Sequence, residues 1–135
     1  MIWVHADALS SAHPVFREAP EGARAVFVWD AAELARRDWS LKRCVFVLEC
    51  LAEMEVELVE GDPVAVLEAT GAQTIYTAAT PDPYVRDVVG RLTAQVRTVR
   101  DVHFASIPDS ADMKRFFRYW NKAKKSVLTR SEDTP

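Results

Sequence analysis

The hydrophobic and polar positions of the chain form alternating short and long blocks, which predict strands and helices in turn. Five short apolar runs predict strands, at residues 2–5, 24–29, 56–60, 73–77 and 96–99. The second run is continuously apolar, as expected for a central strand that is buried on both faces. The last run is short and alternating, which favours an edge position, and residues 102–104 are expected to continue it after a break at Asp101.

Four stretches between these runs predict helices, at residues 13–19, 39–55, 63–70 and from 83 onward. The longest is defined by apolar residues spaced three and four apart: Leu41, Cys44, Val45, Leu48, Leu51 and Ala52. The apolar face of the last helix is expected to comprise Val85, Val88, Val89, Leu92 and Val96. Asp62-Pro63 and Asp82-Pro83 carry the same helix-start signal, an N-cap aspartate followed by a proline in the first turn. Gly71 suits the left-handed position just past a helix end.

Strands that alternate with helices predict a parallel sheet, because parallel strands need crossover connections. Right-handed crossovers then give an α/β, Rossmann-like fold: a three-layer, doubly wound sheet of five parallel strands in the order 3-2-1-4-5, with an extra C-terminal helix. The expected organisation is an α/β domain over residues 1–110, a basic aromatic helix over 111–128 and a disordered tail over 129–135.

In such a sheet, a ligand is expected outside the carboxyl ends of strands one and four, where the strand order reverses. The candidate ligand-binding residues at that rim are His5, Asp7, Trp29, Asp30, Thr77, Thr80 and Asp82. Two interpretations of His5 and Asp7 stay open: a polar pair facing a ligand, or a turn with an aspartate cap and a hydrogen-bonded histidine. Asp82, as an N-cap, adds negative charge and occupies backbone donors, which argues against a phosphate at that helix start.

The chain lacks the sequence motifs of several common nucleotide-binding, metal-binding and catalytic sites. The segment after the first strand has no glycine-rich turn, so neither the dinucleotide fingerprint nor a P-loop is present. The three histidines are scattered, which excludes a zinc-type cluster, and no Gly-x-Ser-x-Gly elbow occurs. Cys44 and Cys50 are expected to be reduced, small core residues of one helix. The sequence therefore predicts no catalytic residue and no metal site. The glutamates at 49, 53, 57 and 60 are expected to be solvated.

Composition adds an asymmetry of charge. The chain of 135 residues has a net charge of −3, but residues 1–112 carry 18 acidic and 10 basic side chains, whereas residues 113–130 carry seven bases and no acid. The N-terminal residues have neither a basic flank nor a long apolar run, so no signal peptide and no membrane span are expected. The expected location is cytoplasmic.

The basic segment also concentrates aromatic side chains. The candidate partner-binding residues there are Phe116, Phe117, Tyr119, Trp120 and Lys122. Three interpretations stay open: the segment packs on the chain's own sheet edge, docks a partner protein, or contacts nucleic acid. The acidic body argues against direct DNA binding. Homo-oligomerisation is a further possible association.

A series of short motifs follows along the chain: Trp3, Asp7, Leu9 and His13-Pro14; Lys42-Arg43, Phe46, Glu49 and Leu51; Gly61-Asp62-Pro63 and Val66-Leu67; Tyr76, Asp82-Pro83-Tyr84 and Arg86; and the aromatic run at 116–122. In order and spacing, over residues 1–125, the chain resembles the N-terminal α/β domain of the DNA photolyase and cryptochrome family. That resemblance implies a domain that holds a pterin or flavin antenna. The large FAD-binding domain that repairs DNA does not follow in this sequence.

The chain departs from that family at its antenna motif. His5 and Ser10 stand where arginines are usual, Ala78 replaces an asparagine, and Val85 replaces a carboxylate that holds a folate in some members. The resemblance therefore implies a photolyase-related, non-catalytic binding or accessory module, serving a separately encoded flavin-binding partner. The alternative is a small-molecule binding protein that holds a pterin, flavin or nucleotide in the crevice where the strand order reverses.

Overall fold

The first residues of the chain already belong to a central strand. A computed structural model describes residues 1–101, and these form one compact unit. Its strands are β1 (Ile2–Val4), β2 (Ala25–Trp29), β3 (Glu57–Glu60), β4 (Thr74–Ala78) and β5 (Gln95–Val99). Its helices are α1 (Val15–Glu18), α2 (Ala31–Arg37), α3 (Leu41–Glu53), α4 (Pro63–Ala69) and α5 (Pro83–Arg91).

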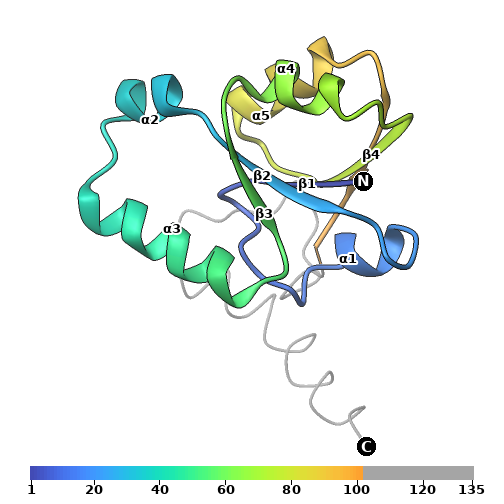
Figure 1. Ribbon diagram of the computed structural model, residues 1–135, viewed down its shortest axis with the longest axis horizontal. Helices are drawn as coiled ribbons and strands as arrows, with labels where there is room; N and C mark the ends of the chain where they lie inside the picture. The colour runs from blue at the N-terminus through green and yellow to red at the C-terminus, as the bar shows by residue number, and fades with distance from the viewer. Residues whose placement is uncertain (102–135) are drawn as a thin grey trace, which may run out of the picture. The chain divides into compact units, whose positions relative to one another are not determined.

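The five strands form one parallel sheet in the order β3-β2-β1-β4-β5, which confirms the predicted strand order (Figure 1). Trp3 at the centre of β1 pairs with Val26 of β2 on one side and with Thr77 of β4 on the other. The strand order therefore reverses between β1 and β4, where two strands leave their carboxyl ends without a connecting loop between them.

Two apolar clusters, one on each face of the sheet, make this a three-layer fold as predicted. One cluster joins the sheet to α1 and α3, and its buried members are Ile2, Val4, Val15, Ala19, Ala25, Phe27, Val47, Leu51 and Met54. The other joins the sheet to α4 and α5, and its buried members are Trp3, Val26, Val28, Leu67, Ile75, Val85 and Val88. Figure 1 shows α4 and α5 on one side of the sheet and α1 and α3 on the other.

The helix-start signals work as the sequence predicts. The side chain of Asp62 accepts a hydrogen bond from the N–H of Ala65, and that of Asp82 accepts one from the N–H of Tyr84. Each aspartate thereby satisfies a backbone donor that has no partner inside its helix. Gly71 follows α4 with a φ of 70°, the left-handed conformation that glycine adopts without strain.

The sequence analysis missed α2 altogether. Asp30 caps this short helix by accepting a hydrogen bond from the N–H of Glu33, and Asp38 ends it in the left-handed conformation. No residue of α2 is fully buried, so the helix has no apolar stripe that periodicity could detect. Two further bounds differ: α3 begins at Leu41, and α5 ends at Arg91, so Val96 belongs to β5 and not to the helix face.

The predicted apolar face of α3 is right at Leu51 and wrong at most of its other positions. The residues that α3 buries against the sheet are Val47 and Leu51, whereas Leu41, Val45 and Leu48 are exposed. The cysteines are free thiols and only half-buried, so they are not the core residues that the sequence predicted. The four glutamates at 49, 53, 57 and 60 are exposed, as expected.

Parts of the prediction lie outside the described residues: the extension at 102–104, the domain boundary at 110, the helix over 111–128 and the tail over 129–135. Within residues 1–101, no helix is both long enough and apolar enough to cross a membrane.

Candidate functional site

The structure divides the predicted ligand-binding residues among three hollows at the carboxyl end of the sheet. His5, Asp30 and Asp82 line a narrow crevice between the ends of β1 and β2 and the starts of α2 and α5. Thr77 and Thr80 line an open pocket beside β4, β5 and α5. Asp7 lines a third hollow. Trp29 lines none of the three and packs against the apolar cluster beneath α1 and α3. The predicted residues are therefore not gathered in one site.

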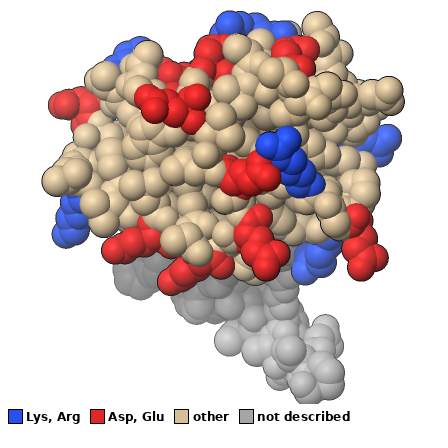
Figure 2. Space-filling view, in the orientation of Figure 1, with Lys and Arg blue, Asp and Glu red and all other residues tan. Residues whose placement is uncertain are grey.

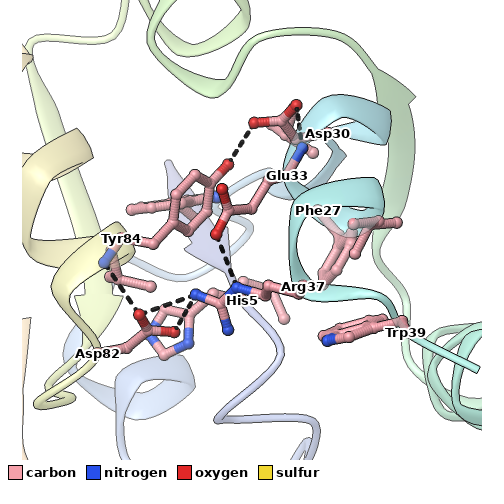
Figure 3. Close-up of a pocket in the computed structure, with 13 residues that line it drawn as sticks. His5, Phe27, Asp30, Glu33, Arg37, Trp39, Asp82 and Tyr84 are labelled. Atoms are coloured by element: carbon pink, nitrogen blue, oxygen red, sulfur yellow. Dashed lines mark hydrogen bonds and ion pairs between the residues drawn. The ribbon is translucent and has the colours of Figure 1, made fainter.

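The narrow crevice is nearly closed. Its volume is about 50 Å³, room for a few water molecules, whereas sites for cofactor-sized ligands are clefts of roughly 300 Å³ or more. Figure 3 shows why: side chains from α2 and α5 reach toward each other across the crevice and meet above it. A pterin or flavin therefore does not fit in the crevice in this conformation.

Arg37 of α2 closes the crevice. Its Nη2 atom donates to both carboxylate oxygens of Asp82, at 2.8 and 2.7 Å, and its Nε donates to Glu33 at 2.7 Å (Figure 3). Its guanidinium carbon also lies 5.3 Å from the ring centroid of Tyr84, a cation–π contact. The two carboxylates and the ring hold one arginine, so α2 is fastened to the start of α5.

The electrostatics of α2 follow from these contacts. Hydrogen bonds from Arg36, and then from Arg37, lower the pKa of Glu33 to about 2. Glu33 is therefore ionised throughout the physiological range. The Arg37 and Asp82 side chains are 24% and 15% exposed, so their attraction is screened less than that of a surface pair.

Tyr84 forms a second bridge across the crevice. Its hydroxyl donates to the Asp30 carboxylate at 2.7 Å, while the other oxygen of Asp30 caps α2 (Figure 3). Burial, and then the Asp30 carboxylate, raise the pKa of Tyr84 far above the ordinary value for a phenol. The hydroxyl therefore stays a donor, and it does not act as a general base.

His5 closes the base of the crevice by tying β1 to β4. Its Nε2 lies 2.8 Å from the carbonyl oxygen of Ala78, so Nε2 carries the proton and donates it. Its Nδ1 accepts a hydrogen bond from the N–H of Asp7 at 3.3 Å. Burial is the main cause that lowers the pKa of His5, and both ring nitrogens are occupied when the ring is neutral. Its role toward a ligand stays a prediction.

The carboxylate of Asp7 is bonded to the segment that follows β4. It accepts a hydrogen bond from the hydroxyl of Thr80, and Thr80 in turn accepts one from the N–H of Asp82. Thr77 is fully buried, and its hydroxyl donates to the carbonyl of Trp3 at 2.8 Å. The polar atoms at this end of the sheet are thus largely bonded to one another.

The open pocket is the larger hollow, at about 370 Å³. It lies between the carboxyl ends of β4 and β5 and the part of α5 that carries Val85 and Val89, and its lining also includes Ala78, Ala79 and Gly90. Arg86 stands at its wall. This side chain is exposed and makes no ion pair within residues 1–101. An apolar hollow with one unpaired cation suits a ligand that has a flat apolar body and an anionic group.

Sequence reasoning missed Glu33 and Arg37, because it missed the helix that carries them. A signal was nevertheless present: Asp30 and Glu33 stand three apart, the spacing of an N-cap and the third residue of a helix. In the sequence, Arg86 stands out only as the last residue of the motif that includes Asp82-Pro83-Tyr84. Its exposure and its place beside a pocket depend on the packing of α5, which no local pattern reveals.

The candidate partner-binding residues, from Phe116 to Lys122, lie outside the described residues. Within residues 1–101, no group of three side chains is arranged to hold a metal ion. Comparison of the chain with protein-family models, with curated proteins and with solved structures found no match.

Proposed function

We propose that the chain is a non-catalytic binding module that holds a small anionic ligand in the open pocket between β4, β5 and α5. The observation that carries the proposal is the combination of a hollow of about 370 Å³ with an exposed arginine at its wall that makes no ion pair with the other described residues, 1–101. Hollows of this size accommodate cofactor-sized molecules, and an unpaired guanidinium is suited to a phosphate or carboxylate.

The lining of the pocket defines the ligand class. Alanine and valine side chains give it an apolar wall, against which an aromatic ring system packs, and Arg86 supplies two parallel donors for an anionic group. A pterin with a carboxylate tail, such as folate, a flavin mononucleotide or a nucleotide has both parts. The closed crevice beneath Arg37 is too small for any of them.

The relation to the photolyase N-terminal domain belongs to the same proposal, and the order of motifs over residues 1–125 supports it. So does the second role, as an accessory module for a separately encoded flavin-binding partner that docks on the aromatic segment. A cytoplasmic location is part of the proposal too, and it is supported by two free thiols in the described chain.

Titration of the full chain with FMN, AMP and folate tests the ligand site. At least one of the three is expected to bind, and Arg86→Gln is expected to weaken its binding about tenfold or more, because a hydrogen bond to a charged group contributes about 1.5–3 kcal/mol. Isothermal calorimetry measures each dissociation constant. The matched control is Arg97→Gln, which removes an exposed arginine of β5 that does not line the pocket.

Two results contradict the proposal. One is that none of the three probes binds below about 1 mM, which is the weak end of useful affinity. The other is that Arg86→Gln and Arg97→Gln weaken binding equally, because the effect would then come from net charge and not from the pocket.

A further inference from the structure

The outward face of α3 carries an uncovered apolar stripe. Leu41, Val45 and Leu48 are 80, 44 and 39% exposed, and Ala52 is exposed one turn further on. Their spacing of four, three and four residues places them in one line along the helix, the pattern of a seam between two helices. Val47, which α3 buries in the core, points to a different side.

Charged residues beside this stripe are divided between the two halves of the helix. Lys42 lies near the start of α3, and Glu49 and Glu53 lie near its end, all exposed. At about 100° per residue, the three share one flank of the stripe. None of them makes an ion pair within residues 1–101. Figure 2 shows acidic groups gathered along the lower edge of the described unit, the side on which Figure 1 places α3.

We infer that this stripe pairs with the same stripe of a second copy of the chain, with the two α3 helices antiparallel across a two-fold axis. An axis midway along the stripe sets Leu41 against the partner's Ala52 and Val45 against the partner's Leu48, so every apolar position meets another. Such an interface is isologous, because the same patch serves both copies.

Charge decides the direction of the pairing. In the antiparallel arrangement, Lys42 lies between the partner's Glu49 and the partner's Glu53, and the same contact is repeated on the other side of the axis. In a parallel arrangement, the charged flanks of the two copies lie on opposite sides of the seam, so Lys42 meets neither Glu49 nor Glu53 of the partner and the attraction is lost. The basic start and acidic end of α3 therefore select a second copy in the antiparallel direction.

The size of the contact limits its strength. One helix of 13 residues from each copy gives an interface at the small end of the range for specific complexes. The dimer is therefore weak and reversible, with a dissociation constant expected in the micromolar range, and its charged flanks make it weaken as salt is added.

Sedimentation velocity on the full chain, from about 1 to 200 µM, tests the inference across the expected range of dissociation constants. A reversible monomer–dimer equilibrium is expected. Leu48→Glu places a charge at the centre of the seam and is expected to weaken the dimer at least about tenfold. The matched control is Leu58→Glu, because Leu58 is also apolar and 50% exposed but belongs to β3 and not to α3. Circular dichroism checks that both variants are folded.

Reversing the charges at Lys42 or at Glu49 and Glu53 tests whether the two α3 helices pair in the antiparallel direction. Lys42→Glu alone is expected to weaken self-association, and so is the double variant Glu49→Lys with Glu53→Lys. Mixing the two variant chains restores two sets of opposite charges, so the mixture is expected to dimerise better than either alone. A chain that is monomeric throughout the range overturns the inference and leaves the stripe to another protein. A dimer that Leu58→Glu disrupts as much as Leu48→Glu overturns it as well. So does a mixture of the two charge variants that associates no better than either variant alone.

Discussion

Replacing Asp82 with Ala is expected to lower the free energy of unfolding by about 3 kcal/mol. The carboxylate of Asp82 caps α5 through the N–H of Tyr84, and loss of an N-cap typically costs about 1 kcal/mol. The same carboxylate receives both hydrogen bonds from Arg37, and its removal leaves a largely buried guanidinium with only part of its compensating charge. Breaking one side of such a pair costs roughly a further 2 kcal/mol, less than for a fully buried pair.

Asp62→Ala is the matched control for this experiment. Asp62 has the same sequence context, an N-cap followed by proline, but it is exposed and its side chain makes one capping hydrogen bond. Its loss is therefore expected to cost only about 1 kcal/mol. Urea unfolding at neutral pH measures both variants. If the two substitutions cost the same, the contact between Arg37 and Asp82 adds nothing to the stability of the fold.

Acidification is expected to destabilise the protein through His5. The pKa of this buried ring is lowered in the folded state, whereas in the unfolded chain it returns to about 6.5. Above that pH neither state binds the proton, so the stabilisation is fully present. As the pH falls below about 6.5, the unfolded state binds the proton first, and the free energy of unfolding falls by up to about 1.4 kcal/mol per pH unit.

The comparison that isolates this effect is the pH dependence of His5→Gln. The glutamine amide also donates to the Ala78 carbonyl but does not titrate, so the variant is expected to show a flatter profile over the same range. Asp7, Asp82 and His13 also act on the ring electrostatically, and they are present in both chains. Glu33 affects the stability over a different pH range. Because its pKa is lowered in the folded state, its contribution to the free energy of unfolding is lost only as the pH falls below about 4.5. Parallel profiles for the two chains would show that His5 titrates freely in the folded state.

The Arg37 contacts also bear on where a ligand enters. The crevice at the ends of β1 and β2 adjoins the reversal of strand order between β1 and β4, where a site is predicted, yet α2 covers this crevice with an arginine that two carboxylates hold. The larger hollow lies beside β4 and β5, and its arginine makes no ion pair in the described part of the chain. The proposed site is therefore next to the predicted one and shares Thr77 and Thr80 with it.

Local patterns in the sequence were sufficient for the strand order. The five apolar runs and the crossover rule lead to the sheet β3-β2-β1-β4-β5, because parallel strands joined by right-handed crossovers have few possible arrangements. The caps at Asp62 and Asp82 were equally predictable, since a cap depends on residues within one turn of each other. By contrast, α2 has no apolar stripe, and α3 has a stripe that its own core does not use.

By itself, then, the sequence determined which segments are strands and helices, with one helix missed, and how the strands are ordered, because periodicity and capping act over a few residues. Only the tertiary structure decided which side chains meet. Asp62 and Asp82 are alike in sequence, yet only Asp82 receives an arginine that lies 45 residues away in the chain. Which apolar face of α3 is buried, and which arginine is left unpaired beside a pocket, depend in the same way on packing between distant segments, and no local pattern carries that information.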